Sequence, residues 1–351
     1  MTKLPCAVLG ATGVVGQYFL ALLADHPEFQ VQKVCASESR TGRRIADVPR
    51  LIDADLSALG DLEFSPLDMV SLADAGIRVV FSALPADVSK QIEPQAAQAG
   101  LCVFSNASAF RMAPQVPILI PEVNADQLAL VEYQQRDTSG FIVTNANCTT
   151  TGLALALLPL RALGIRRVIL SSYQAISGAG YPGLSALDIS GNVIPYIAGE
   201  EEKIALESGK IFGRLNGETI CHADWEVQAH CIRVPTRVGH LLSVHVEMEK
   251  TVAESQIVQL YEHCEAPLAV QGLATAPHKP VLLTKDPCRP QPLHDVLAGT
   301  PARARGMAVT VGRLQVKGNA VRFVALANNL IRGAAGGSVL NAELAHREGR
   351  L

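Results

Sequence analysis

Residues 7–16 read Ala-Val-Leu-Gly-Ala-Thr-Gly-Val-Val-Gly, and this stretch decides the expected fold. A short apolar run ends in a glycine-rich turn, and Val14–Leu23 then carries apolar residues at helical spacing. Glycines at positions 10, 13 and 16 let the backbone turn tightly and approach a pyrophosphate, whose charge is met by the N-terminus of the helix. The order of strand, glycine turn and helix therefore predicts a nucleotide-binding turn.

The first third of the chain repeats this alternation of strand and helix. Further short apolar strands are expected at residues 31–36, 79–84, 101–104 and 141–144. Strands and helices in turn predict an α/β fold with a doubly wound parallel sheet, that is, a Rossmann-type domain.

The pattern changes after residue 148, where longer β-rich segments predict a second, α+β domain. Its strands are expected at 168–173, 231–235, 241–248, 308–316 and 321–327. A polar helix is expected around 200–210, and another opens at Thr251 with the spacing of a capping box.

Two later segments complete the expected organisation. Residues 267–301 hold seven prolines without a clear period, so we expect a long surface excursion there. Residues 332–347 are expected to form one helix that packs back on the first domain. The predicted domains are 1–148 completed by 329–351, and 149–328 for catalysis and dimerisation.

Composition favours a folded enzyme with a small-molecule partner. The chain has 351 residues, of which 48% are hydrophobic and 18% charged, and its formal net charge is −3. Such a small charge gives no reason to expect a nucleic-acid or membrane surface. The N-terminus lacks the pattern of a secretory signal, and the longest apolar stretch, Leu153–Leu163, is too short to cross a bilayer. A cytoplasmic location is therefore expected.

Eight cysteines are scattered along the chain without a CxxC pair, which argues against a disulfide framework or a zinc ribbon. Most cysteines are expected to be small buried hydrophobes. The histidines and the cysteine near residues 222–245 have spacings that match no zinc pattern, so no metal site is predicted.

The loop after the second strand indicates which dinucleotide binds. An NAD site usually places an acidic residue there, but residues 37–44 read Ser-Glu-Ser-Arg-Thr-Gly-Arg-Arg. Hydroxyl and guanidinium groups suit a 2′-phosphate, so NADP is the predicted cofactor. The alternative is a solvated basic loop in which Glu38 meets the ribose.

Residues 141–153 read FIVTNANCTTTGL and place Cys148 between an apolar strand and the expected start of a helix. The positive end of a helix dipole favours the thiolate, which is the reactive form of cysteine. The alternative is one more buried thiol, but Asn147 and three threonines supply donors that a structural cysteine does not need. Residues 231–240 add Arg233 and His240, and histidine is the side chain best suited to acid/base work near neutral pH.

Eight ordered motifs over nearly the whole chain resemble aspartate-semialdehyde dehydrogenases of the archaeal and fungal branch. The motifs are Gly10–Gly16, Ser105–Met112, Ile120–Asn124, Asn145–Thr150, Gln174–Gly180, Gly199–Lys203, Arg233–Pro235 with Gly239-His240, and Asn329–Gly336. The resemblance implies NADP-dependent reduction of L-4-aspartyl phosphate to L-aspartate 4-semialdehyde, on the route to lysine, threonine and methionine. It also implies a homodimer or homotetramer.

The resemblance assigns roles to residues that match the family motifs. Cys148 is the implied nucleophile that forms an acyl-thioester, His240 the general acid/base, and Gln174 the residue that orients the intermediate. For the substrate, Arg233 is implied to pair with the α-carboxylate and Glu200, or an adjacent glutamate, with the α-ammonium. The other implied substrate residues are Asn147 and the phosphate-binding pair Lys203 and Arg111. The implied cofactor residues are Gly10, Thr12, Gly13, Val14, Val15, Ser37, Arg40, Ser82, Ser177, Gly178 and Asn329.

The chain departs from the family pattern at three places. The loop at 37–44 exchanges a serine and an arginine, Phe110 replaces a more polar ring, and Ile232 replaces an asparagine before Arg233. Phe110 and Ile232 adjoin implied substrate residues, so an acyl-CoA reductase of the malonyl-CoA reductase kind stays an alternative. N-acetyl-glutamyl-phosphate reductases match fewer motifs. A non-catalytic NADP-binding protein is the third reading, against which Cys148 and His240 both argue.

Overall fold

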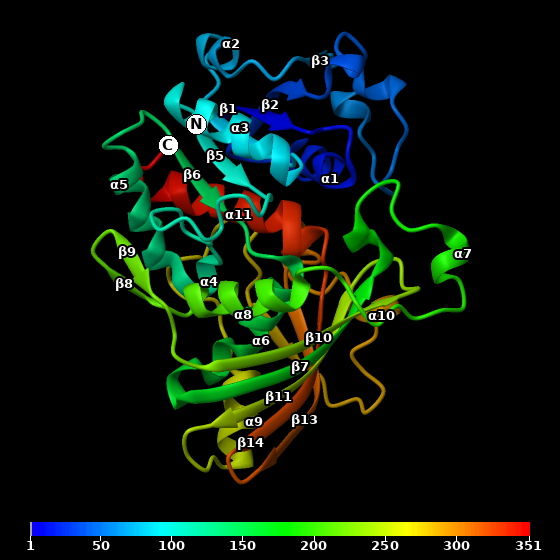
Figure 1. Cartoon of the computed structure of the whole chain (residues 1–351), viewed down its shortest axis with the longest axis vertical. Coiled ribbons are helices and arrows are strands. Elements are labelled where there is room, and N and C mark those ends of the chain that lie inside the picture. Colours follow the sequence, from blue (N-terminus) through cyan, green and yellow to red (C-terminus); the bar gives the residue numbers. More distant parts are fainter. Residues whose placement is uncertain (1) are drawn as a thin grey trace. The chain divides into compact units, whose positions relative to one another are not determined.

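The computed structural model describes residues 2–351, which form two compact units (Figure 1). Among the described residues, the first unit comprises 2–146, Leu215–Ile220 and Ala334–Leu351, and the second comprises Asn147–Arg214 and Cys221–Gly333. The second unit therefore begins at Asn147, and the chain returns to the first unit at Ala334. Cys148 consequently belongs to the second unit.

The first unit contains a six-stranded sheet in which every pair is parallel. Its order is β3-β2-β1-β4-β5-β6. The strands are β1 (Leu4–Leu9), β2 (Phe29–Cys35), β3 (Phe64–Ser65), β4 (Val79–Ser82), β5 (Cys102–Ser105) and β6 (Phe141–Thr144). The order reverses between β1 and β4, as in doubly wound sheets, so the predicted Rossmann-type fold class is confirmed.

Helices on both faces cover this sheet. Its longer helices are α1 (Val14–Leu23), α2 (Met69–Asp74), α3 (Ala86–Gln98) and α11 (Gly336–Arg347), and the short ones are α4 (Pro121–Asn124) and α5 (Val131–Gln134). Helix α1 packs against α11, while α2 packs against α3. The buried side chains of Ala7, Leu9, Val80 and Val103 join the sheet to α2 and α3.

The C-terminal helix begins later than predicted. Residues Ile331–Ala335 form a π-helical turn, and Ala334 has a non-helical backbone with φ −146° and ψ −105°. This break separates the turn from α11, which starts at Gly336 instead of residue 332. Glu343 of α11 then accepts a 2.8 Å hydrogen bond from His26, and both side chains are fully buried. This bond ties α11 to the start of β2.

The glycine turn has a clear steric cause. Gly10 has φ +72°, and a side chain at Gly16 would place Cβ 2.2 Å from the Gly10 oxygen and 2.6 Å from the Ala11 Cα. The turn therefore needs glycine at both positions. Helix α1 then begins without a side-chain cap and without an acidic residue in its first turn. Its first N–H groups remain suited to an anion.

The second unit contains a mixed six-stranded sheet of order β10-β7-β11-β14-β13-β12. The strands are β7 (Ile165–Ala175), β10 (Glu226–Val234), β11 (His240–Met248), β12 (Val281–Leu283), β13 (Val309–Lys317) and β14 (Ala320–Ala327). Strands β7 and β10 are parallel, whereas β11 is antiparallel to β7 and β14. The C-terminal ends of β7, β10 and β14 and the N-terminal end of β11 therefore meet at one end of this sheet.

Helices cover one face of this second sheet. Helix α6 (Cys148–Leu157) packs on β11, β13 and β14, α8 (Glu200–Ile211) on β10 and α6, and α9 (Glu254–Glu262) on β12 and β13. The opposite face, over β7, β11, β13 and β14, carries a hollow of about 330 Å³. The remaining elements are the short helices α7 (Ala186–Ile189) and α10 (Pro292–Asp295), and the hairpin of β8 (Arg214–Asn216) and β9 (Thr219–Cys221).

Two local predictions in this unit were wrong. The N-cap of helix α9 is Ala253, whose methyl side chain cannot accept a hydrogen bond from the first turn, so the capping box expected at Thr251 does not form. Residues 267–301 are only partly a surface excursion, because Val270 and Val281 are fully buried and β12 adds an edge strand to the sheet. This burial depends on the pairing of β12 with β13, a partner distant enough in the sequence that local patterns do not reveal it. Within residues 2–351, no helix combines the length and the apolar character needed to span a membrane.

We expect the substitution Gly16→Ala to destabilise the first unit. The added methyl group must displace the backbone of Gly10 and Ala11, and such overpacking lowers the free energy of unfolding by about 3 kcal/mol. Urea denaturation measures the change. Gly13→Ala is the matched control, because its Cβ would lie 3.5 Å from the nearest atom, the Gly10 oxygen. Equal stability of the two variants would contradict the steric account of the turn.

Candidate active site

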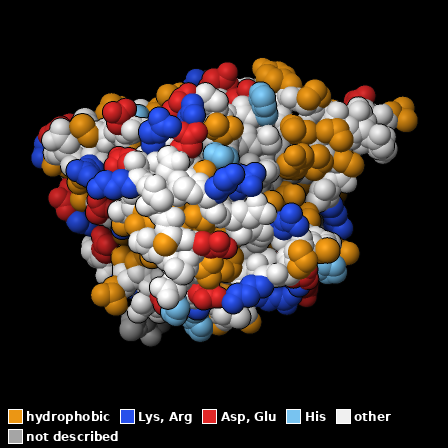
Figure 2. Space-filling view, turned by 90° about the horizontal axis from the view of Figure 1, so that it is seen from below, with side chains coloured by type: hydrophobic (Ala, Val, Ile, Leu, Met, Phe, Trp, Pro, Cys, Tyr) orange, Lys and Arg blue, Asp and Glu red, His pale blue; other side chains and the backbone are white. Residues whose placement is uncertain are grey.

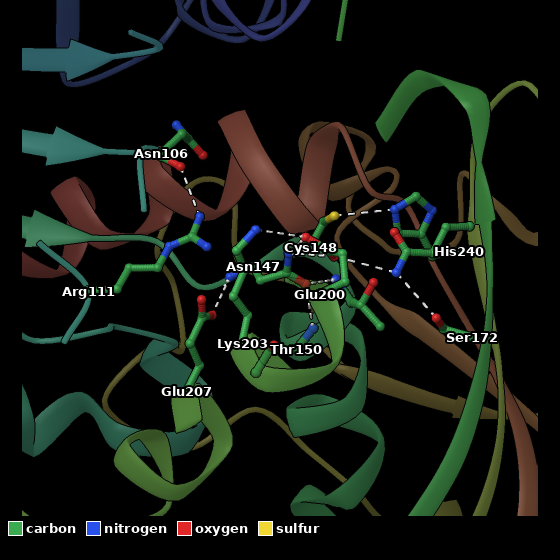
Figure 3. A network of polar contacts seen from close by, with 12 residues as sticks. Asn106, Arg111, Asn147, Cys148, Thr150, Ser172, Glu200, Lys203, Glu207 and His240 are labelled. Carbon is green, nitrogen blue, oxygen red and sulfur yellow. Dashed lines mark hydrogen bonds and ion pairs between the residues drawn. The ribbon is translucent and has the colours of Figure 1, made fainter. Parts of the chain in front are cut away.

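Cys148 is the first residue of helix α6, and it is the only half-buried cysteine within the described residues 2–351. Its Sγ lies 3.2 Å from Nε2 of His240 (Figure 3). Burial raises the pKa of Cys6 and Cys35 to about 12 and of Cys102 to about 11, so those thiols are inert. The thiol at the helix N-terminus is therefore the one placed for nucleophilic chemistry.

The other side chains around Cys148 come from the end of the second sheet at which the termini of β7, β10, β11 and β14 meet. Gln174 lies at the end of β7 and pairs in register with Arg233 at the end of β10. His240 begins β11 and pairs with Ala327 at the end of β14. An amide, a guanidinium and an imidazole thus lie together at this end of the sheet.

His240 is fully buried and its orientation fixes its tautomer. Its Nδ1 accepts a 3.1 Å hydrogen bond from the backbone N–H of Ala175. A neutral ring that accepts at Nδ1 carries its proton on Nε2, the atom that faces Cys148. Burial, followed by the nearby Arg233 cation, lowers the pKa of His240 to about 3. The ring therefore stays neutral near neutral pH.

Asn147 connects the nucleophile to helix α8. Its Oδ1 accepts from the N–H groups of Thr149 and Thr150 at 2.9 and 3.3 Å and so caps α6. Its Nδ2 donates to both carboxylate oxygens of Glu200 at 3.1 and 2.9 Å. Glu200 also lies 3.2 Å from Nζ of Lys203. The carboxylate of Glu200 is thus the centre of a polar network beside the thiol (Figure 3).

Arg233 adds a buried positive charge to this group. Its Nη1 donates to the carbonyl oxygen of Ala175 at 2.7 Å, and burial lowers its pKa while Cys148 and Glu200 oppose that shift. A Cβ at Gly178 would lie 2.7 Å from this Nη1 and 3.2 Å from Nε2 of His240. A glycine at position 178 therefore leaves the room that both side chains occupy.

The comparisons with known proteins agree with this geometry. Two family models match the chain, "Semialdehyde dehydrogenase, NAD binding domain" over residues 5–131 and "Semialdehyde dehydrogenase, dimerisation domain" over residues 157–332. The aspartate-semialdehyde dehydrogenase of Archaeoglobus fulgidus is 45% identical over 346 residues, which cover 97% of each chain. The chain belongs to the aspartate-semialdehyde dehydrogenase family.

Two further relatives of this family are informative. The crystal structure of aspartate semialdehyde dehydrogenase with NADP from Candida albicans covers 100% of both chains, with a TM-score of 0.89 and 32% identity. The malonyl CoA reductase (NADP) of Metallosphaera sedula is 34% identical and covers 99% of this chain and 98% of its own. The family resemblance inferred from the motifs is therefore confirmed.

The structure brings most of the predicted substrate and catalytic residues of the family together within the second unit. These residues are Asn147, Cys148, Gln174, Glu200, Lys203, Arg233 and His240. Three predicted cofactor residues also belong to this unit. Asn329 accepts from the N–H of Gly239 and donates to Ser177 Oγ, both at 2.9 Å, and Gly178 follows Ser177.

The other predicted cofactor residues lie in the first unit at the carboxyl ends of its strands. Thr12, Gly13, Val14 and Val15 are half-buried around the start of α1. Ser37 and Arg40 follow β2, and Arg40 forms no ion pair with any residue of the described range 2–351, whereas Arg44 pairs with Asp47. Ser82 differs from the expectation of an open cofactor contact, because it is fully buried and its hydroxyl donates to Glu93 at 2.7 Å.

Arg111, the second predicted phosphate residue, also lies in the first unit. Its Nε and Nη2 each donate at 2.9 Å, to the carbonyl oxygens of Asn145 and Asn106. The bond to Asn145 holds the guanidinium against the backbone that precedes Cys148, and the bond to Asn106 holds it against the loop after β5. The described residues contain no group of three His, Cys, Asp or Glu side chains arranged to hold a metal ion.

The structure refines two of the sequence arguments. Ile232 adjoins Arg233 in the chain, but successive strand residues point to opposite faces, so Ile232 does not share the face of Arg233. Of the three glutamates that begin α8, Glu200 faces Asn147, whereas Glu201 accepts from the N–H of Cys231 at 3.1 Å and Glu202 is exposed. Glu200 is therefore the one of these three glutamates that contacts the residue before Cys148.

Sequence reasoning missed several residues that shape this site. Glu207 accepts a hydrogen bond from the N–H of Asn147, and a Cβ at Gly333 would lie 2.6 Å from the Cβ of Cys148. The N–H of Ala175 sets the tautomer of His240. The spacing of seven residues between Glu200 and Glu207, which puts both on one helix face, was a signal that could have revealed Glu207. A backbone donor leaves no such signal.

We expect the buried neutral His240 to make stability depend on pH. In the unfolded chain the ring binds a proton below about pH 6.5, whereas in the folded chain its pKa of about 3 prevents this. The unfolded state therefore gains protons as the pH falls, and the free energy of unfolding drops by about 2 kcal/mol between about pH 6.5 and about pH 5.

Urea denaturation of the wild type and of His240→Asn at both pH values isolates this contribution. The stability difference between the two proteins should shrink or reverse at the lower pH, because the asparagine variant lacks the titrating ring. If the stability difference between the two proteins does not change with pH, His240 binds its proton over the same pH range in the folded and the unfolded chain.

Proposed function

We propose that this chain is an NADP-dependent aspartate-semialdehyde dehydrogenase that reduces L-4-aspartyl phosphate to L-aspartate 4-semialdehyde and releases phosphate. The observation that carries the proposal is the thiol of Cys148, 3.2 Å from His240 and beside the buried, oppositely charged Arg233 and Glu200. A buried cation and a buried carboxylate complement the α-carboxylate and α-ammonium of an amino-acid substrate. The family membership supports the same assignment.

The first unit fits NADP through its glycine turn. The N-terminus of α1 has neither a side-chain cap nor an acidic residue, and Gly13 leaves its surroundings open to a pyrophosphate. Ser37 and Arg40 after β2 would hold the 2′-phosphate, with Thr12, Val14 and Val15 along the turn. Ser177, Gly178 and Asn329 are proposed for the nicotinamide end. When bound, NADPH supplies the hydride that reduces the acyl carbon.

The first chemical step uses Cys148. Its thiolate forms a bond to the acyl carbon while the carbon–oxygen bond to phosphate breaks, and the phosphate leaves with the bonding electrons. Lys203 and Arg111 are proposed to stabilise the charge on the leaving phosphate. The product on the enzyme is a thioester on Cys148, with Arg233 and Glu200 holding the amino-acid end of the acyl group.

His240 is proposed to act as a neutral hydrogen-bond donor. Its Nε2–H faces the sulfur because Nδ1 is occupied by the N–H of Ala175. After reduction of the thioester carbon, the developing oxyanion accepts this donor, and collapse breaks the carbon–sulfur bond and regenerates the thiolate. No proton has to leave the imidazole in these steps. This role differs from the general acid/base role that the family resemblance implies.

We also propose that the enzyme assembles as a homodimer, or a tetramer built from dimers, through the open face of the second sheet. This face contains Ile169, Ser171, Ser243 and His245 around the hollow of about 330 Å³, and it lies within the matched dimerisation domain. Residues 181–196 of the same unit also expose Tyr181, Leu187 and Tyr196 by 68%, 93% and 65%. On the face shown in Figure 2, hydrophobic side chains gather mainly at the upper right. Assembly would cover such apolar area.

The proposed reaction is tested by NADP⁺ reduction with aspartate semialdehyde, with and without phosphate. We expect turnover that depends on phosphate and that Cys148→Ala lowers by more than about 10³-fold. Lys203→Ala should raise the KM for phosphate, because it removes an ammonium group that is proposed to bind the phosphate anion. Lys285→Ala is the matched control, since Lys285 is exposed and pairs with Glu262.

NADPH oxidation with malonyl-CoA is measured alongside, because it tests the alternative function of an acyl-CoA reductase. Turnover with the CoA ester alone would reject the aspartyl phosphate substrate while keeping the Cys148 thioester. Full activity of Cys148→Ala with either substrate would reject the catalytic proposal altogether.

The proposed dimer is tested with Ser243→Arg. Ser243 is exposed in the middle of β11, where it pairs with Ser171 and Val324. A bulky charge there should block sheet-to-sheet association, so light scattering should give a monomer mass for the variant and at least a dimer mass for the wild type. A variant with the wild-type mass would place the interface elsewhere.

A further inference from the structure

Glu207 makes a contact that none of the predicted roles explains. Its Oε2 accepts a hydrogen bond of 2.6 Å from the backbone N–H of Asn147, the residue before the nucleophile (Figure 3). Glu207 is only 2% exposed, so this carboxylate is held away from solvent. A carboxylate that accepts a backbone N–H in a buried setting forms one of the stronger hydrogen bonds in a protein.

Helix α8 contacts both the side chain and the backbone of Asn147. Glu200 in its first turn accepts from the side-chain Nδ2 of Asn147, and Glu207, seven residues on, accepts from the main-chain N–H. Residues seven apart lie on the same face of a helix. One rigid helix therefore fixes both the side chain and the backbone of the residue that precedes Cys148.

The backbone bond matters because Asn147 is the N-cap of α6. Its Oδ1 caps Thr149 and Thr150, and its carbonyl accepts from Thr151 N at 2.8 Å. With the bond to Glu207, every polar group of Asn147 has a partner, so the residue has one allowed orientation. That orientation sets where the Sγ of Cys148 lies relative to Nε2 of His240.

A buried cation balances the charge of Glu207. Lys210, one turn further along α8, is 2% exposed and interacts electrostatically with Glu207, and burial lowers its pKa to about 8. An uncompensated carboxylate beneath the N-terminus of α6 would disfavour the thiolate of Cys148. The Lys210 cation allows Glu207 to act as an acceptor with less of this opposing charge.

We propose that Glu207 is a positioning residue for the nucleophile, which locks the turn before Cys148 through the N–H of Asn147, with Lys210 as its charge partner. The inference deepens the proposed function, because it concerns the reactivity of the same thiol. A purely structural Glu207 would affect folding stability alone. A positioning Glu207 affects the reactivity of Cys148 in the folded protein.

Two variants separate the hydrogen bond from the charge pair. Glu207→Asp keeps the negative charge beside Lys210 but shortens the reach towards Asn147. The double variant Glu207→Gln with Lys210→Met keeps an acceptor oxygen of the original reach and removes both charges. We expect Glu207→Asp to lower the rate constant for alkylation of Cys148 by iodoacetamide at least about 10-fold, because a displaced reactive group loses its supporting contacts. The double variant should react at close to the wild-type rate.

Peptide mapping by mass spectrometry follows Cys148 separately from the exposed Cys221 and Cys288. In the dehydrogenase assay, kcat should fall in Glu207→Asp while the KM for the semialdehyde changes little. Glu343→Asp is the matched control, since Glu343 is an equally buried carboxylate whose partner, His26, lies in the first unit. It should alter thermal stability without altering alkylation of Cys148.

Alkylation of Cys148 at the wild-type rate in Glu207→Asp would overturn the proposal. A double variant that reacts as slowly as Glu207→Asp would also overturn it, because the effect would then come from the charge pair and not from the hydrogen bond. The alkylation measurement needs no substrate or cofactor. Absence of semialdehyde turnover in the wild type would therefore reject the proposed function without deciding the role of Glu207.

Discussion

The N-cap of helix α6 is the constraint on which the rest of the second unit depends. Asn147 must cap the helix, and the helix must start at Cys148 for the thiol to lie at its positive end. The strand ends of β7, β10 and β11 then have to meet at this point, because His240, Gln174 and Arg233 have fixed places on them. The topology of the mixed sheet follows from this requirement, since only an antiparallel β11 starts where β7 and β10 end.

Burial gives this constellation its chemical character. In water the ring of His240 would titrate near neutral pH and the charges of Arg233 and Glu200 would be screened. Within the unit, the ring is held neutral and the two charges are fixed by hydrogen bonds to backbone and amide groups. Donors held in this way need no reorganisation when charge develops on the substrate, which is the basis of electrostatic stabilisation. The same burial requires Lys210 to accompany Glu207.

Much of the fold was predictable because its signals are local. The strand before Gly10 and the helix Val14–Leu23 follow from apolar periodicity and glycine placement, and the polar helix expected around 200–210 is present as α8. The failures share a different cause. The start of α11 moves to Gly336 because Ala334 adopts a non-helical backbone. Residues 281–283 become an edge strand because β13 offers them a partner. Neither event is visible in a window of local sequence.

The sequence by itself determined the residue types of the site and their order, since Cys148, Glu200, Arg233 and His240 stand in motifs of one family. Only the tertiary structure decided which atoms face one another. It assigns the proton of His240 to Nε2 through a backbone N–H, selects Glu200 among three adjacent glutamates, and brings Glu207 to Asn147. The physical reason is that backbone donors are the same at every position, so their partners depend on how strands and helices meet and not on residue identity.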